Sequence, residues 1–262
     1  RDGKAPHTRV VMDGDLIVTF DVRKGPQYRV GRVEVSGNTY VPTGDLAAVL
    51  RTREGRPFTD AGLTGDQTAI ESLYRERGFT GVRVQADRDL AEPPPGATQV
   101  AVAVSFRIVE GVRTVVGAVR IEGNASVPDA VLRPRLGLQP GTAYFDAQLR
   151  SDRDAIQLEY ANRGYPSASV DAQPGFSAGR ADANPVFVVR EGPRVFVGHI
   201  LITGNFRTSA RTIERELLLK PGDPLSLAAE LESQRRLAAL QLFRRAPQIT
   251  EVRHGDESLR DL

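Results

Sequence analysis

Hydrophobic and polar residues alternate along several short segments of the chain. Residues 32–36, 82–87 and 100–108 each place apolar side chains at every second position. This period is typical of a β-strand that buries one face and exposes the other to water. In the longest segment the residues expected to share the buried face are Val100, Val102, Val104, Phe106 and Ile108.

Two helices are expected between the first and second of these strands. Apolar residues at positions 46, 49 and 50 give the first helix one buried face, and Pro42 suits its first turn. We expect Arg53-Glu54-Gly55 to end this helix. Thr59 or Asp60 can cap the second helix, and Gly78 is suited to the residue after its end. The buried side of the second helix is expected to contain Leu63, Ile70, Leu73 and Tyr74.

These elements predict an α+β fold with the order β-α-α-β-β. Because each strand has a single apolar face, the economical arrangement is a small three-stranded sheet covered on one face by two helices. The other face of the sheet is then left to solvent.

The pattern G-x5-G-x5-G-N occurs three times, which indicates tandem copies of this unit. The second copy starts 86 residues after the first, and the third starts 81 residues after the second. The glycines of the pattern are Gly25, Gly31 and Gly37, then Gly111, Gly117 and Gly123, then Gly192, Gly198 and Gly204.

The spacing predicts four segments of the chain. Residues 28–112 and 113–193 are expected to be complete repeats, and 194–262 a third repeat that stops before its last strand. Residues 1–27 are expected to be the C-terminal part of an upstream repeat, with LIVTFDV as its final strand. In the second copy, Pro134 is expected to shorten or kink the first helix. The sequence is therefore interpreted as a window from a longer protein.

The segments between copies are short and carry glycine at both ends. Such a link is too short for a loose tether, so we predict limited, directional hinges between the repeats. The predicted hinge residues are Gly25, Gly31, Gly111, Gly117, Gly192 and Gly198.

Composition excludes several kinds of site. The chain has no cysteine, so it has no disulfide and no cysteine-ligated metal. The net charge is +2 and no dense Lys/Arg stripe is present, which argues against a nucleic-acid partner. No apolar run approaches the length of a membrane-spanning helix. His7, His199 and His254 are scattered, with no H-x3-H spacing and no carboxylate pairing nearby, so we predict no metal site, no general base and no cofactor.

One short motif has an enzymatic interpretation. Residues 175–179 read G-F-S-A-G, which matches the G-x-S-x-G string that carries a serine nucleophile. That motif requires a strand before the serine and a helix after it. Here Ser177 falls between two predicted strands, so a hairpin loop is the better interpretation. A serine hydrolase that uses Ser177 is the remote alternative, and we predict that the chain is not an enzyme.

Several motifs recur in a fixed order in each copy. A V-x-V-x-G-N strand (residues 33–38 in the first copy) is followed by two helices and an R-G-F/Y turn at residues 77–79 and 163–165. A closing strand then ends in E-G at residues 110–111 and 191–192. This order resembles the POTRA domains of the BamA/TamA family of outer-membrane protein assembly factors, and the resemblance covers essentially the whole chain.

The resemblance implies a location and partners. It implies a periplasmic arm that is attached to the outer membrane of a Gram-negative bacterium through a C-terminal barrel, which this sequence does not include. It implies that the arm acts as a scaffold or chaperone for unfolded outer-membrane protein precursors and docks accessory periplasmic proteins or lipoproteins. The same fold also implies an alternative, the arm of a two-partner secretion transporter that recognises one dedicated cargo.

The resemblance also implies that the strand after each R-G-F/Y turn lies at a sheet edge. An edge strand has unpaired N–H and C=O groups and can accept another chain as an added strand. The opposite interpretation is that Arg83, Asp87 and Arg88 block the edge. The candidate binding residues are Val82, Arg83, Val84, Gln85, Ala86 and Asp87 in the first copy, and Ala168, Ser169, Val170, Asp171 and Ala172 in the second.

Overall fold

The computed structural model describes residues 10–11, 17–18, 25–90, 92–94, 96–243, 247–253 and 258–262. The chain divides into two compact units, one formed by residues 1–74 and 82–110 and the other by residues 75–81 and 111–262. The short strands β1 (Val10–Val11) and β2 (Ile17–Val18) pair in antiparallel fashion. Most of the predicted upstream strand, LIVTFDV, lies outside the described residues.

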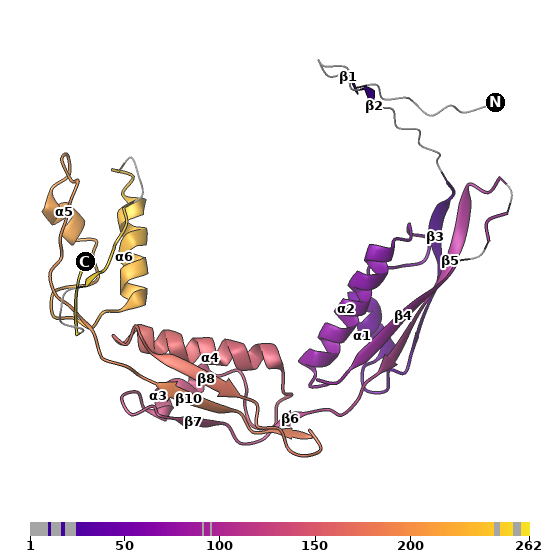
Figure 1. Cartoon of the computed structure of the whole chain (residues 1–262), viewed down its shortest axis with the longest axis horizontal. Helices are drawn as coiled ribbons and strands as arrows, with labels where there is room; N and C mark the ends of the chain where they lie inside the picture. Colours follow the sequence, from indigo (N-terminus) through magenta and orange to yellow (C-terminus); the bar gives the residue numbers. More distant parts are fainter. Residues whose placement is uncertain are drawn as a thin grey trace. The chain divides into compact units, whose positions relative to one another are not determined.

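The first copy forms a three-stranded sheet with both helices on one side of it (Figure 1). β5 lies in the middle, parallel to β3 and antiparallel to β4. The predicted buried residues of β5, from Val100 to Ile108, are all buried, whereas Ala101 and Ala103 between them are exposed. The predicted α+β unit is therefore confirmed. Its elements are β3 (Gln27–Ser36), α1 (Thr43–Val49), α2 (Asp60–Glu76), β4 (Arg83–Leu90) and β5 (Gln99–Val109).

The second copy has the same order, but its first and last strands are each broken in two. Pro185, which has no N–H to donate, lies in the break of the last strand. Pro134 likewise limits the first helix to four residues, followed by a 3₁₀ turn, as predicted. The elements are β6 (Val115–Val116), β7 (Arg120–Glu122), α3 (Asp129–Leu132), η1 (Arg133–Arg135), α4 (Asp146–Ala161), β8 (Ser169–Gln173), β9 (Asp182–Ala183) and β10 (Val186–Arg190).

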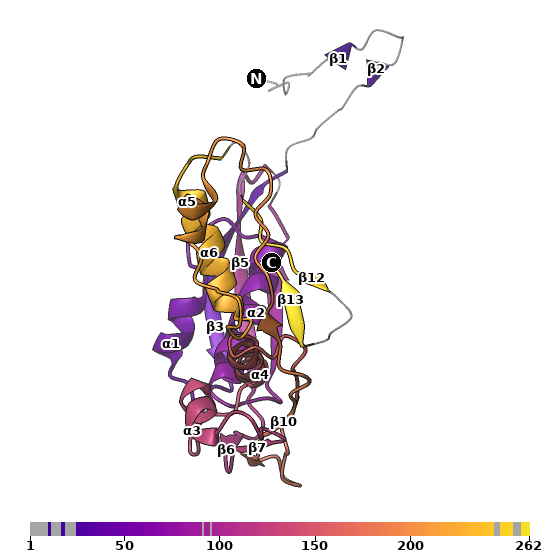
Figure 2. The ribbon, with the colours of Figure 1, turned by 90° about the vertical axis from the view of Figure 1, so that its left-hand side faces the viewer.

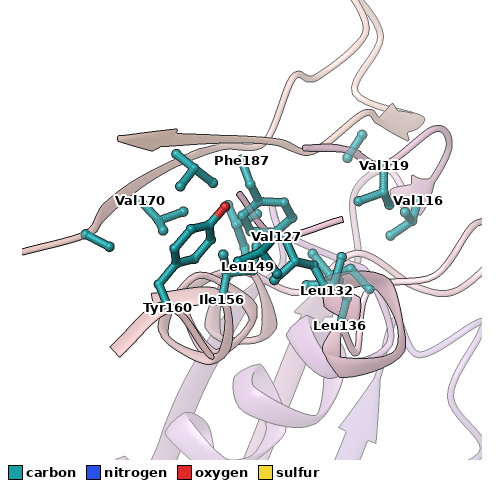
Figure 3. Close-up of a cluster of buried hydrophobic side chains, with 14 of the residues drawn as sticks. Val116, Val119, Val127, Leu132, Leu136, Leu149, Ile156, Tyr160, Val170 and Phe187 are labelled. Carbon is teal, nitrogen blue, oxygen red and sulfur yellow. The ribbon is translucent and has the colours of Figure 1, made fainter. Parts of the chain in front are cut away.

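The sheet of the second copy repeats the topology of the first. β10 lies between β7, to which it is parallel, and β8, to which it is antiparallel, and β6 pairs in parallel with β9. Figure 3 shows the core beneath this sheet, where Phe187 of β10 lies over Leu132, Ile156 and Tyr160 from the helices.

The third copy contains a short middle strand, which corrects the prediction that the chain stops before it. β13 pairs in parallel with β11 and in antiparallel fashion with β12, as the yellow pair in Figure 2 shows. The residues of β13, Leu-Arg-Asp, have no apolar alternation, so periodicity did not reveal them. The elements are β11 (Phe196–Val197), α5 (Ala210–Glu214), α6 (Leu227–Ala239), β12 (Val252–Arg253) and β13 (Leu259–Asp261).

The first strand also begins earlier than predicted. β3 starts at Gln27 rather than at Arg32, and the ladder to β5 shifts register between Val30 and Arg32. Gly31 is thus the extra residue of a β-bulge. A Cβ atom at this position would lie 3.0 Å from the Cβ of Ala101, so glycine allows the two strands to approach closely.

A buried carboxylate, and not the Arg-Glu-Gly sequence, holds the end of the first helix. α1 ends at Val49, and the next two free amides, those of Arg51 and Thr52, donate to the carboxylate of Asp66 at 2.8 and 2.7 Å. Asp66 is 1% exposed and lies on α2. Asp66 supplies acceptors for the loop amides, so the chain can end the helix at Val49, before the predicted stop at residues 53–55.

The same interaction recurs in the other copies. Asp152 of α4 accepts hydrogen bonds from the amides of Gly137 and Leu138 at 2.7 and 2.9 Å. In the third copy Ser233 of α6 takes this position and accepts one bond, from Leu218 N at 2.8 Å. A buried amide without a partner is costly, so these side chains stabilise the connection between the two helices of each copy.

We expect Asp152→Ala to lower the free energy of unfolding by about 2–4 kcal/mol, because two amides lose their acceptor. Asp152→Ser should lower the free energy of unfolding by about half as much, because the serine hydroxyl can still accept one amide hydrogen bond, as Ser233 does in the third copy. Urea unfolding followed by circular dichroism measures both values. Asp154→Ala is the matched control on the exposed side of α4, and a loss as large as that of Asp152→Ala would contradict this role.

Candidate functional site

The structure places β4 at the edge of the first sheet. β4 pairs with β5, and β3 occupies the far side of β5. The strand begins at Arg83, so Val82 precedes it and is buried instead of belonging to the edge. Within the strand Val84 and Ala86 face the helices, and Arg83, Gln85 and Asp87 are exposed.

One acceptor on β4 is already occupied by a side chain. The amide Nε2 of Gln67 on α2 donates to the backbone O of Val84 at 2.7 Å. Because the Val84 carbonyl already accepts this hydrogen bond, it is a poorer acceptor for an N–H of an incoming strand than an unoccupied carbonyl. This cap could not be predicted from the sequence, because a single glutamine on a helix has no distinctive pattern.

The charged residues of β4 have different surroundings. Arg88 forms an ion pair with Asp60 of α2 and lies 5.9 Å from the ring centre of Phe58. It is therefore directed towards the helix side of the strand. Arg83 and Asp87 remain on the exposed face, where their role in blocking the edge stays a prediction.

The second candidate edge, β8, has the same position but a different cap. β8 starts at Ser169, and Ala168 before it is buried. Arg153 stands 86 residues after Gln67 but contacts Asp154 at 2.7 Å instead of the strand. Asp171 forms an ion pair at 2.9 Å with Arg190 of the neighbouring β10. The glutamine cap of β4 thus has no counterpart from this position on β8.

In the first two copies, a glutamate after the middle strand ties three elements together. Glu110 accepts hydrogen bonds from the amides of Thr39 and Tyr40, at 2.7 and 2.8 Å, and from the hydroxyl of Tyr74 at 2.8 Å. This is the glutamate of the E-G motif. Its side chain joins the loop after β3 to α2, so the motif has a structural role that its sequence pattern does not indicate.

Glu191 makes the equivalent contacts in the second copy. It accepts from the amide and the hydroxyl of Ser126, at 2.7 and 2.6 Å, and from the hydroxyl of Tyr160 at 2.8 Å. Burial raises the pKa of Glu191, but hydrogen bonds from Ser126 and Tyr160 outweigh it and hold the pKa below its ordinary value. Burial and the bond to Glu191 raise the pKa of the Tyr160 hydroxyl, so it stays a donor.

The R-G-F/Y turns accept hydrogen bonds from the segment that follows each closing strand. In the second unit, Thr114 N donates to Gly78 O at 2.8 Å, and Val195 N donates to Gly164 O at 2.7 Å. Gly78 and Gly164 have φ values of 98° and 90°. A Cβ atom at Gly164 would lie 2.9 Å from Val195 O, so glycine is required for both the backbone angle and this contact.

The predicted hinge glycines occupy two kinds of position. Gly111 and Gly192 follow the E-G glutamates and have φ values of 76° and 68°. Gly25 precedes β3 with open space around it. The remaining three lie within or beside the first strand of a copy, where a Cβ atom would meet a side chain of a neighbouring segment; these are Gly31, Gly117 and Gly198. Hinge motion at all six remains a prediction.

The serine of the G-x-S-x-G motif and one of the three histidines lie among the described residues. Ser177 lies in the loop between β8 and β9, where its Oγ accepts from Asp182 N at 3.1 Å, so the hairpin-loop interpretation is confirmed. His199 does have a carboxylate nearby, because its amide donates to Asp261 Oδ1 at 2.6 Å. His7 and His254 lie outside the described residues. Among the residues that the structure describes, no three His, Asp or Glu side chains are grouped so as to hold a metal ion.

None of the described helices is both long enough and apolar enough to cross a membrane.

Comparisons with known proteins agree on one family. The POTRA family, described as "surface antigen variable number repeat", matches residues 28–111 and 114–192, which is more than half of the chain. A putative outer membrane protein assembly factor of Treponema pallidum is 29% identical over 249 residues, covering 93% of this chain and 30% of that protein. The outer membrane protein assembly factor BamA of Neisseria meningitidis is 25% identical over 239 residues, covering 87% of this chain and 29% of that protein.

The chain therefore spans about 30% of the length of these relatives. Among solved structures, the crystal structure of POTRA3-5 of Haemophilus influenzae BamA has a TM-score of 0.52 and 20% sequence identity. The match covers 90% of this chain and 94% of that one. This likeness agrees with the fold of the three copies.

The lowered pKa of Glu191 predicts a loss of stability in acid. A carboxylate with a lowered folded-state pKa stabilises the fold above its unfolded pKa, near 4.5, and this contribution disappears as pH falls through the folded-state pKa. We expect Glu191→Gln to cost about 1–3 kcal/mol at pH 7 and little at pH 3.

Urea unfolding at pH 7, 5, 4 and 3 measures this dependence. Glu122→Gln, an exposed carboxylate of β7, is the matched control and should shift stability little at any pH. A Glu191→Gln cost that is the same at pH 7 and pH 3 would argue against the charged clamp.

Proposed function

Because the chain belongs to the POTRA family, we propose that it is the periplasmic scaffold arm of an outer-membrane β-barrel assembly factor. In this proposal β4 and β8 bind unfolded barrel precursors by accepting them as added strands. The observation that carries the proposal is the position of both strands at sheet edges, directly after the R-G-F/Y turns. The names of the two relatives, both assembly factors of outer-membrane proteins, support the same role.

The proposed location and partners follow from the same family. The arm lies in the periplasm of a Gram-negative bacterium and is attached to the outer membrane through a barrel beyond this sequence. Accessory periplasmic proteins or lipoproteins dock on the arm. The arm acts by binding and has no catalytic group of its own.

Backbone pairing suits a receptor for many different clients. Main-chain N–H and C=O groups are the same in every polypeptide, so pairing with them does not depend on client sequence. Each added hydrogen bond contributes about 0.5–1.5 kcal/mol net, and ordering the client costs about 1–2 kcal/mol per residue. Single edges therefore bind weakly, at about micromolar to millimolar Kd, and edges in series raise the affinity through effective concentration.

Of the two edges, β8 is the better acceptor in this proposal. Gln67 occupies the Val84 carbonyl of β4, whereas the corresponding Arg153 is paired with Asp154. In an antiparallel ladder alternate residues direct both backbone groups away from the neighbouring strand. Val84 O accepts a bond from outside the ladder, so Val84 is a residue of this outward-facing kind. Its counterpart on β8 is Val170. We therefore expect Val170, and Ala172 two residues later, to direct their backbone groups to the free edge of β8.

We expect Ala172→Pro to weaken binding of an unfolded barrel-strand peptide at least fivefold, because proline removes the edge N–H. Titration of the ¹⁵N-labelled chain with the peptide, followed by NMR shifts, measures both the site and the Kd. Ser169→Ala is the matched control, since it changes an exposed side chain and leaves the backbone donors unchanged. Shifts that spare both β4 and β8 would refute edge binding.

We further expect Gln67→Ala to strengthen binding at β4 by about two- to tenfold, because it frees one acceptor worth about 0.5–1.5 kcal/mol. The same NMR titration, read at residues 83–87, measures the change. Thr68→Ala on the same helix is the control. Unchanged affinity at β4 would show that the cap does not limit this edge.

A further inference from the structure

The first strand of the first copy, β3, forms the edge of its sheet opposite to β4. A segment of the same unit already covers the start of this edge. Val30 N donates to Arg56 O at 2.9 Å, and Val30 O accepts from Gly55 N at 2.7 Å. This segment runs antiparallel to β3 and reaches only as far as Val30. Residues 32–36 of β3 lie beyond this cover.

The β-bulge at Gly31 determines which backbone groups of residues 32–36 face outwards. Val30 faces away from β5, and the extra residue shifts the alternation by one, so Val33 and Val35 are the next residues to face away. In the described part of the chain, no hydrogen bond from outside the sheet reaches the backbone of these two valines. The edge therefore offers two N–H and two C=O groups to an added strand.

The second copy shows how this edge can be closed. Arg133 Nη1 donates to the backbone O of Val119 at 3.1 Å, and Val119 stands 86 residues after Val33. Asp129 accepts two hydrogen bonds from the same guanidinium, at 3.0 and 2.8 Å, and so holds it in place. Val119 is 7% exposed, whereas Val33 is half-buried. Arg133 thus occupies an acceptor that an added strand would use.

The first copy lacks both parts of this cap. Ala47, an exposed residue of α1, stands 86 residues before Arg133, and Thr43 stands at the position of Asp129. Alanine has no donor that could reach the Val33 carbonyl, so this acceptor stays open. The space that the arginine side chain takes in the second copy is also left open beside α1.

A group of arginines lies where an added antiparallel strand would end. Such a strand runs from Ser36 towards Arg32, so its C-terminal end points at residues 51–56. The exposed charged side chains of this segment are three arginines and one glutamate, namely Arg51, Arg53, Arg56 and Glu54. This excess of positive charge favours a strand that is followed by acidic residues.

We propose that the open edge of β3 is a further strand-binding site, which takes an extended segment of a partner polypeptide antiparallel to residues 32–36. The segment has aliphatic side chains opposite Val33 and Val35, where they cover Ala47, and acidic residues at its C-terminal end. This inference goes beyond the proposed function, because β3 lies across the sheet from β4. A client on β4 and the segment on β3 can therefore bind to the same sheet together.

Two peptides of one composition test the site and its direction. The probe is Ac-TVTVTEE-NH2, and the control is Ac-EETVTVT-NH2, which places the acidic residues at the other end. In NMR titrations of the ¹⁵N-labelled chain at low salt, the Kd read at residues 32–36 should be at least threefold lower for the probe. Equal Kd values, or no shifts at residues 32–36, would overturn the proposal. Shifts at β4 and β8 test the proposed function, so the two proposals can fail separately.

Transfer of the cap from the second copy should close the edge. The double variant Thr43→Asp, Ala47→Arg is expected to raise the Kd of the probe at residues 32–36 at least fivefold, because the arginine takes the Val33 carbonyl. Thr43→Asp, Ala48→Arg is the matched control, since it has the same charges with the arginine at the next exposed position of α1. Equal Kd values for the two variants would contradict the site.

The reverse change keeps the proposal testable if the double variant does not fold. Arg133→Ala removes the cap of the second copy and should produce new probe-dependent shifts at residues 119–121. Arg150→Ala, which removes an exposed arginine of α4, is the control and should produce none. Shifts at residues 119–121 that do not change with Arg133→Ala would refute the cap and with it the proposal.

Discussion

In each three-stranded sheet the middle strand is the last strand of its copy. The two outer strands form ladder hydrogen bonds with this strand and not with each other. β5 joins β3 to β4, β10 joins β7 to β8, and β13 joins β11 to β12. The parallel pairing with the first strand requires contacts across most of a copy, which carry a high entropic cost of loop closure. The apolar face of the middle strand offsets this cost by covering both helices.

Two sets of carboxylates hold the loops around this core. Asp66 and Asp152 accept amides from the loop after the first helix, and Glu110 and Glu191 accept amides from the loop after the first strand. Charge-assisted hydrogen bonds are stronger than neutral ones, so four side chains order four loops that have little apolar surface of their own. In the third copy Ser233 takes the aspartate position and accepts one amide.

The proposed binding uses the edges of the sheets. An open edge offers backbone groups and suits clients of any sequence, and its use depends on local caps such as Gln67. An arm built from several such copies can combine several weak, general sites.

The sequence by itself determined the repeat, the order of elements and the faces of the strands. Each of these predictions depends on residues that are close together in the sequence. The signals are the glycine spacing, the alternation in residues 100–108 and the proline at position 134. The roles of Asp66, Glu110 and Gln67 could not be read in this way, because each joins segments 14 or more residues apart. The middle strand of the third copy likewise depends on pairing between residues 196–197 and 259–260. Only the tertiary structure decided these features, since long-range hydrogen bonds and packing leave no periodic signal in the sequence.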